Sequence, residues 1–157
     1  MMLTFQQVNG DHSHDSELVC EIARVFCSAR EERLKFLLDL RNIEEDCRFL
    51  SEVVLRDNCV WIAEVDGKIA GFIAFQKGWV NHLYIDPPFQ RQGIGRKLLE
   101  IAKRSSDALK LWVFEINSPA IAFYEKEGFR IIERTRGARN EARMPDVCMM
   151  WEESGRE

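Results

Sequence analysis

The sequence predicts an α/β fold, in which a mixed, mostly antiparallel central sheet is flanked by helices on both faces. Three observations carry this prediction. Apolar residues alternate as in strands over several short stretches, and elsewhere they recur with the spacing of an amphipathic helix. Asp66 and Gly67 form a two-residue turn between two strand-like stretches. A glycine-rich turn at residues 90–95 joins a strand-like stretch to a helix-like one.

The N-terminal third is predicted to contain one strand and two or three helices. Residues 3–8 read as a strand, and the polar residues 9–15 that follow are typical of a turn. Apolar residues then repeat at intervals of three and four, which indicates helices that each bury one face. These residues are Leu18, Val19, Ile22, Val25, Phe26, Leu34, Leu37, Leu38, Leu40, Ile43, Cys47, Leu50 and Val54.

The middle of the chain is predicted to form a three-stranded meander. Residues 59–65 and 68–75 flank the Asp66-Gly67 turn, so they pair as a tight antiparallel hairpin. A third strand follows at residues 79–85. After the glycine-rich turn and its helix, we expect strands at residues 109–116, 129–135 and 147–151, a short helix that carries Tyr124, and a charged loop at residues 136–145.

Length and composition predict one globular domain, residues 1–157, that is large enough to bury a core. With 46% hydrophobic and 31% charged residues the chain has the composition of a soluble protein. Its net charge of −4 argues against nucleic acid as the main partner. Because no apolar run approaches the length of a membrane span and no signal peptide is recognisable, we expect no membrane association and a cytoplasmic location.

The cysteine pattern argues against a metal centre. The chain has five cysteines, an odd number, and no C-x-x-C pair. This pattern favours reduced thiols that pack as small apolar residues, so no metal site is predicted. A catalytic cysteine is a weaker alternative, because no neighbouring cluster of histidine or arginine indicates a lowered thiol pKa.

The glycine-rich turn predicts a phosphate-binding site. Residues 90–95 have the sequence Q-R-Q-G-I-G and lie between a strand and a helix. A helix N-terminus presents unpaired backbone N–H groups with partial positive charge, and glycines let a ligand approach the backbone closely. Arg91 and Arg96 add charge to the turn. The sequence matches neither the P-loop, G-x-x-x-x-G-K-[ST], nor the dinucleotide fingerprint, G-x-G-x-x-G.

A second motif lies at residues 117–129, which have the sequence N-S-P-A-I-A-F-Y-E-K-E-G-F. Ser118 can cap a helix, Pro119 suits the first turn, and Gly128 can end the helix in the left-handed conformation. Tyr124 is therefore predicted to lie on a short helix that follows a strand.

Together the two motifs resemble the landmarks of the GNAT superfamily, the acetyl-coenzyme A dependent N-acyltransferases. Residues 90–95 are similar to its Q/R-x-x-G-x-G/A signature, and residues 117–129 to its N-x-x-A-x-x-F-Y-x-x-x-G-F landmark. The resemblance covers roughly residues 59–151. It implies a single GNAT-like domain with acetyl-CoA as co-substrate. The implied reaction transfers the acetyl group to a primary amine of an unidentified acceptor, by direct attack in a ternary complex.

The resemblance also implies which residues bind the cofactor. The glycine-rich turn would hold the pyrophosphate, and the main chain of residues 83–85 would pair with the pantetheine arm. Main-chain donors there would act as an oxyanion hole for the acetyl carbonyl. The cofactor-binding residues implied in this way are Leu83, Tyr84, Ile85, Arg91, Gln92, Gly93, Ile94, Gly95, Arg96 and Asn117.

Two residues are candidates for catalysis. Tyr124 stands where the family commonly has a general acid for the departing thiolate, although it could also be a core aromatic residue. A phenol, with a pKa of about 10, stays protonated at neutral pH and can donate to sulfur. His82 is a candidate base, although a structural histidine is the other interpretation.

The base position is where the sequence departs from the family pattern. Many members have an acidic residue or a histidine at the positions of Trp79 or Asn81, and neither residue is a base. Strand alternation places the adjacent His82 on the face opposite Asn81, Leu83 and Ile85. A water relay to a distant carboxylate is equally compatible. Further candidates for contact with the acceptor are Glu115, Asn140 and Glu141.

Two other functions stay open from the sequence. The missing base motivates an acyl-CoA-binding sensor or interaction module without turnover. An acyltransferase acting on a macromolecule, such as a protein amine or aminoacyl-tRNA, would differ only in its acceptor. For RNA the arginines of residues 130–143 are the only support, and acidic residues dilute them. We therefore expect a small-molecule or peptide amine as acceptor and no nucleic acid. Pairing across the last strands could form a homodimer.

Overall fold

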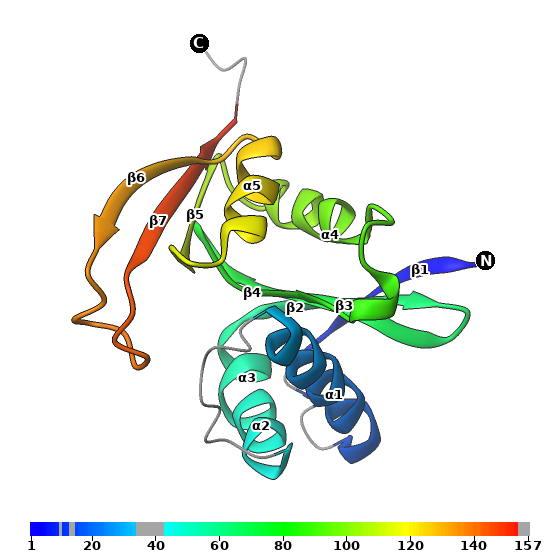
Figure 1. Cartoon of the computed structure of the whole chain (residues 1–157). Helices are drawn as coiled ribbons and strands as arrows, with labels where there is room; N and C mark the ends of the chain where they lie inside the picture. The colour runs from blue at the N-terminus through cyan, green and yellow to red at the C-terminus, as the bar shows by residue number, and fades with distance from the viewer. Residues whose placement is uncertain (10, 13–14, 34–42, 154–157) are drawn as a thin grey trace.

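The computed structural model describes residues 1–9, 11–12, 15–33 and 43–153. Within this part of the chain, strands form one sheet in the order β1-β2-β3-β4-β5-β7-β6 (Figure 1). All neighbouring strands are antiparallel except β4 and β5, which confirms the mixed, mostly antiparallel sheet. The strands are β1 (Leu3–Val8), β2 (Cys59–Val65), β3 (Lys68–Gln76), β4 (Trp79–Ile85), β5 (Ala108–Phe114), β6 (Arg130–Thr135) and β7 (Asp146–Glu152).

Helices cover both faces of the sheet, as predicted. They are α1 (Ser16–Arg33), α2 (Ile43–Phe49), the π-helical segment η2 (Leu50–Val54), α3 (Leu55–Asp57), the 3-10 turn η3 (Pro87–Phe89), α4 (Ile94–Lys103) and α5 (Ser118–Lys126). Figure 1 shows α1, α2 and α3 on one face and α4 and α5 on the other. The helix expected around residues 34–40 lies outside the described residues.

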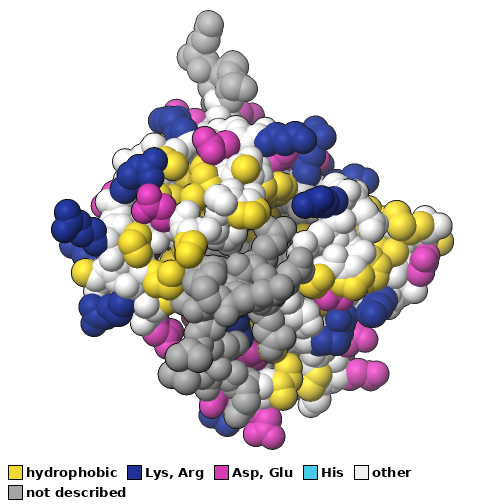
Figure 2. Space-filling view, viewed as in Figure 1, with side chains coloured by type: hydrophobic (Ala, Val, Ile, Leu, Met, Phe, Trp, Pro, Cys, Tyr) yellow, Lys and Arg dark blue, Asp and Glu magenta, His cyan; other side chains and the backbone are white. Residues whose placement is uncertain are grey.

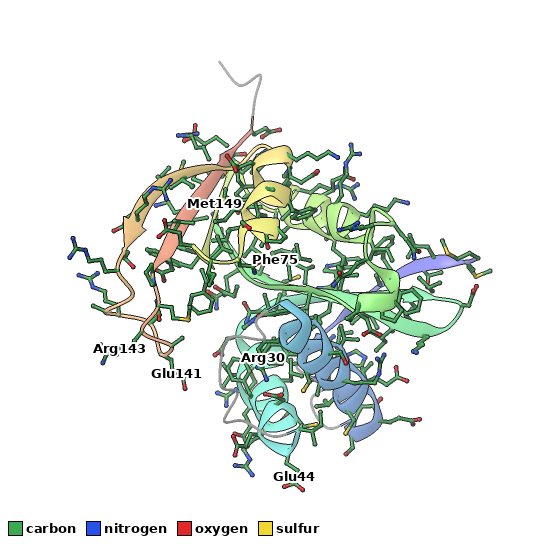
Figure 3. The ribbon with its side chains drawn as sticks, in the orientation of Figure 1. Arg30, Glu44, Phe75, Glu141, Arg143 and Met149 are labelled. Atoms are coloured by element: carbon green, nitrogen blue, oxygen red, sulfur yellow. The ribbon has the colours of Figure 1, made fainter. Side chains whose placement is uncertain are left out.

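Two hydrophobic cores lie on opposite faces of the sheet. β3 is covered on both sides, so its whole interior is buried. Because side chains alternate along a strand, Ile73 and Phe75 pack with α4, whereas Phe72 and Ala74 pack with α1 and η2. Figure 3 shows Phe75 on the side of α4 and α5, in the same core as Met149 of β7.

Most strand ends agree with the prediction. β1, β2 and β4 begin and end at the expected residues, and β3 runs one residue further, to Gln76. β5 ends at Phe114 instead of Ile116, because the chain turns there toward α5. The N–H of Asn117 donates to the carbonyl of Phe114 (3.0 Å), and that of Ser118 to the carbonyl of Ile116 (2.9 Å).

β4 and β5 diverge along their length. Trp79 and Lys110 are the single paired position that the described residues show between these two strands. Beyond it, no described strand pairs with the edge of β4 formed by residues 80–85. The backbone N–H and C=O groups on such an edge can pair with an extended ligand.

A β-bulge in β4 changes which residues share a face. His82 pairs with Ala74 and Val80 with Phe75, so Asn81 is the extra residue. Val80, instead of the predicted Asn81, therefore packs in the same core as Leu83 and Ile85. The expectation that His82 lies on the opposite face is confirmed, but strict alternation was wrong for Asn81.

Candidate active site

A cleft of about 900 Å³ lies where β4 and β5 separate, with walls from these strands, α5 and the start of α4. Among the predicted catalytic and cofactor-binding residues, Gln92 is the one that does not line it. The Gln92 side chain is exposed, and its amide donates to the Pro88 carbonyl at 3.4 Å. The predicted residues that line the cleft are His82, Leu83, Tyr84, Ile85, Arg91, Gly93, Ile94, Gly95, Arg96, Asn117 and Tyr124.

The turn before α4 has a geometry that suits anion binding. Gly93 precedes the helix with φ of +81°, and Arg91 also has a positive φ, +63°. This conformation turns the chain sharply, and Gly93 has no side chain that could cap the first amides of α4. Because Gly93, Ile94 and Gly95 all line the cleft, the positive end of the helix dipole lies at its wall.

Two side-chain contacts that the sequence did not predict hold this turn. The carboxylate of Asp86, only 3% exposed, pairs with the guanidinium of Arg24 on α1 at 2.8 Å. The side-chain amide of Gln90 donates to the carbonyl of Ile85, at the end of β4, at 3.0 Å. The turn is thereby tied both to α1 and to the end of β4.

The local structure of α5 places Tyr124 at the cleft. Asn117, and not the predicted Ser118, caps this helix, because the Asn117 side-chain oxygen accepts the N–H of Ala120 at 3.4 Å. Ser118 is the first residue of the helix. Gly128 follows the helix end with φ of +95°, as predicted.

Packing fixes the ring of Tyr124. The ring lies edge-to-face against Phe123, with 5.2 Å between ring centroids, and against Phe129, with 5.5 Å. Tyr124 is half-buried and lines the cleft. It is therefore both a packed aromatic residue and part of the cleft wall.

His82 lies among aromatic rings from three elements. It packs edge-to-face against Phe26 of α1 (5.9 Å between ring centroids) and Phe49 of α2 (5.6 Å). The ring of Tyr84, on the same strand, stacks at 6.3 Å. His82 is half-buried and lines the cleft, so these rings hold an imidazole at its wall.

Side-chain hydrogen bonds close the loop between β6 and β7. Asp146 accepts from the Thr135 hydroxyl and from the Asn140 amide (3.1 Å). Asn140 also donates to the carbonyl of Met144 (2.7 Å) and accepts its N–H (3.1 Å). A Cβ on Gly137, which has φ of +86°, would lie 2.2 Å from the Met144 carbonyl oxygen. Asn140, a predicted acceptor contact, lines the cleft, but its side-chain amide makes its hydrogen bonds within the loop.

The other two predicted acceptor contacts are not among the residues that line the cleft. Glu115 is exposed and pairs with Arg134 at 3.5 Å. Glu141 lies at the tip of the loop between β6 and β7 (Figure 3). Within the arginine-rich segment, Arg134 pairs with Glu115 and Arg130 pairs with Glu152, each at 3.5 Å. These acidic partners interrupt the positive charge of the segment. Figure 2 shows Lys and Arg interspersed with Asp and Glu on this face, without a continuous basic stripe.

The described wall of the cleft carries few acidic or imidazole side chains. Two carboxylates line it among the described residues, those of Asp146 and Glu127. Asp146 accepts two hydrogen bonds in its loop, and Glu127 faces Arg96 at 3.7 Å. His82 is the one imidazole on the described part of the wall.

Three further features are absent from the described residues. No three His, Cys, Asp or Glu side chains in these ranges gather as metal ligands would. None of the helices described above is long and apolar enough to cross a bilayer. All five cysteines lie in the described part of the chain, and none is in a disulfide.

Known proteins share both the sequence pattern and the fold. A model of the acetyltransferase (GNAT) domain matches residues 56–131. The peptidyl-lysine N-acetyltransferase YiaC of Escherichia coli K12 is 33% identical over 92 residues, 58% of this chain and 62% of that protein. The peptidyl-lysine N-acetyltransferase YjaB of the same strain is 32% identical over 120 residues, 73% of this chain and 78% of that protein.

A solved structure has the same architecture along the chain. The PaiA N-acetyltransferase from Thermoplasma acidophilum, in complex with coenzyme A, superimposes with a TM-score of 0.73 at 23% identity, covering 97% of this chain and 99% of that one. The chain spans 62% of the length of YiaC, and 41% and 59% of two archaeal relatives. Because the match to YjaB covers 78% of that protein at 32% identity, this chain belongs to the GNAT acetyltransferase family.

Proposed function

We propose that this chain is an N-acetyltransferase that moves the acetyl group of acetyl-CoA to a primary amine by direct attack in a ternary complex. One observation carries the proposal: the open edge of β4, the start of α4 and Tyr124 all line one cleft. Such a cleft suits a long thioester cofactor. Its phosphates would lie at the helix, its arm along the strand edge and its sulfur near a proton donor.

The cofactor would be bound mainly by backbone groups. The amides of residues 93–95 hold the pyrophosphate, with Arg91 and Arg96 supplying charge. The edge of β4 at residues 83–85 pairs with the pantetheine arm, and an N–H there donates to the acetyl carbonyl. Since the Gln92 side chain faces Pro88, Gln92 would contribute only its backbone.

The Asn117 side-chain oxygen caps α5, which leaves its amide N–H groups for the cofactor. Asn117 lines the cleft beside the residues of α5. It would therefore both fix the start of the helix that carries Tyr124 and contact the cofactor.

Two proton transfers would complete the reaction. Tyr124 donates a proton to the sulfur as the thioester breaks, and its rigid packing against Phe123 and Phe129 keeps the phenol in place. The amine arrives charged, and making it neutral at pH 7 costs roughly 4 to 5 kcal/mol. His82, the one imidazole on the described part of the cleft wall, would accept this proton.

The acceptor would be a peptide amine. YiaC and YjaB are named for acetylating peptidyl lysine, and a further relative, 38% identical over 73 residues, for the alanine of ribosomal protein bS18. The mixed charge on the face seen in Figure 2 gives no support to a nucleic-acid acceptor. A cytoplasmic location and a homodimer stay predictions from the sequence.

A thermal-shift and turnover screen tests the proposal. Acetyl-CoA should raise the unfolding midpoint in proportion to ln(1 + [L]/Kd), because it binds only the native state. Lysine peptides, peptides with N-terminal alanine, polyamines and amino acids are then compared by thiol release. Tight acetyl-CoA binding without turnover on any amine would instead support an acyl-CoA sensor. If millimolar acetyl-CoA did not shift the unfolding midpoint, both the acetyltransferase and the acyl-CoA sensor would be overturned.

A further inference from the structure

α1 and α2 bring two cysteine side chains into contact. Cys20 and Cys47 are 27 positions apart in the sequence, yet their Sγ atoms lie 3.7 Å apart. Cys20 is exposed and Cys47 is half-buried. A disulfide has an S–S separation of about 2 Å, so bond formation requires these two sulfurs, on neighbouring helices, to move closer together.

We propose that Cys20 and Cys47 form a redox-modification site, at which an oxidant of the peroxide class joins them in a disulfide that ties α1 to α2. The reaction balances in atoms and electrons. The two thiols lose two electrons and two protons, one S–S bond forms, and hydrogen peroxide is reduced to two waters.

The environment of the two thiols sets the order of steps. Burial raises the pKa of the Cys47 thiol to about 11, and the neighbouring Cys20 and the carboxylates of Asp46 and Glu44 add to the rise. Cys47 therefore stays protonated near neutral pH and reacts slowly with peroxide. The exposed Cys20 reacts first: its sulfur attacks the peroxide, the O–O bond breaks, and Cys20 becomes a sulfenic acid as the other oxygen leaves as water with the Cys20 proton. The sulfur of Cys47 then attacks that of Cys20, and the departing hydroxyl leaves as water with the Cys47 proton.

The disulfide would act on the wall of the cleft. α1 and α2 also carry Phe26 and Phe49, the two rings that pack edge-to-face on His82. Drawing these helices together moves the rings that hold His82, whereas α4 and α5 lie on the other face of the sheet (Figure 1). If the proposed acetyl transfer holds, oxidation changes turnover of the amine and leaves acetyl-CoA binding unaltered.

The experiment follows the thiols directly, so it does not depend on the proposed function. The full chain is reduced, treated with a small excess of hydrogen peroxide, alkylated with iodoacetamide and digested for mass spectrometry. We expect two of the five thiols to escape alkylation and the peptides of Cys20 and Cys47 to be linked until dithiothreitol is added. The unfolding midpoint should rise by roughly 5 to 10 °C, because a crosslink over this loop restricts the unfolded chain.

Matched variants make the result decisive. Cys20→Ser and Cys47→Ser should each abolish both the linked peptide and the rise in midpoint, whereas Cys59→Ser, in β2, should keep both. Retention of all five alkylatable thiols would overturn the proposal. So would oxidation of Cys20 to a sulfinic acid without any link, or a link from Cys47 to another cysteine.

Discussion

The two sides of the cleft are built in different ways. On the cofactor side, from β4 to the end of α5, backbone conformation sets the local geometry, as at Gly93 and Gly128 with their positive φ angles, and the pair Arg24–Asp86 ties the turn to α1. On the acceptor side, side-chain contacts hold α1 to α2 and close the loop between β6 and β7. An example is the buried pair Arg30–Asp46 at 3.1 Å (Figure 3 labels Arg30). Where backbone conformation sets the geometry, the sequence carries short local motifs. Where contacts between side chains of separate elements set it, the sequence carries no such motif.

The largest effect should come from Tyr124→Phe, which tests the cofactor side at its reactive end. Phenylalanine keeps the packing against Phe123 and Phe129 but removes the proton donor. We expect kcat to fall by about 100-fold or more. The thermal shift produced by acetyl-CoA should stay unchanged. Turnover within twofold of the unmodified protein would mean that Tyr124 only packs.

His82→Phe should have the next largest effect, and it tests the acceptor side. Phenylalanine can pack with Phe26 and Phe49 but cannot accept a proton, so kcat/KM should fall by about 10- to 100-fold near pH 7. The loss should shrink as pH rises toward 10, because more of the amine is then already neutral. Rates measured from pH 6.5 to 10 check this.

Tyr84→Phe is the matched control for this prediction. It alters a neighbouring ring on the same face and removes no imidazole. A loss in His82→Phe that is the same at every pH would show that the ring only supports the cleft wall. A similar loss in both variants would lead to the same conclusion.

Gly93→Ala should weaken acetyl-CoA binding by about tenfold. A Cβ costs about 1 kcal/mol at a positive φ, and here it also stands where phosphate would approach the backbone. Gly67→Ala is the matched control, because Gly67 has φ of +82° against +81° for Gly93 and equally open surroundings, but lies in the hairpin between β2 and β3. Both variants should lose similar stability. Equal affinity for acetyl-CoA in the two variants would show that the phosphates do not bind at this turn.

The same contrast explains what the sequence could and could not predict. The hairpin, the glycine turn and the helix carrying Tyr124 follow from local rules, so their positions were predicted closely. The cap of α5 was assigned to Ser118 instead of Asn117, because both residue types cap helices and only the backbone decides between them.

Features that depend on residues far apart in the sequence could not be predicted from local sequence patterns. The bulge at Asn81 depends on how β4 pairs with β3, and it has no marker in the sequence of β4 itself. The pair Arg24–Asp86 spans 62 positions and Cys20–Cys47 spans 27, so only the folded chain brings them together. Asp146 was missed at the cleft for the same reason, since its partner Thr135 lies on another strand.

Asp146→Asn should have the smallest effect, and it sharpens the comparison by disturbing the acceptor side alone. Asparagine keeps only one of the two acceptor oxygens and loses the negative charge, so one of the two part-buried hydrogen bonds to residue 146 is weakened, at a cost of about 1 to 2 kcal/mol. For a chain of this size the unfolding midpoint should fall by roughly 2 to 8 °C. The shift caused by acetyl-CoA should not change, because no cofactor contact is placed in this loop. Thr135→Val, which removes the other hydrogen bond to Asp146 and keeps its charge, should lower the midpoint to a similar extent. If either variant lost the shift caused by acetyl-CoA, the acceptor side and the cofactor side of the cleft would be coupled through this loop.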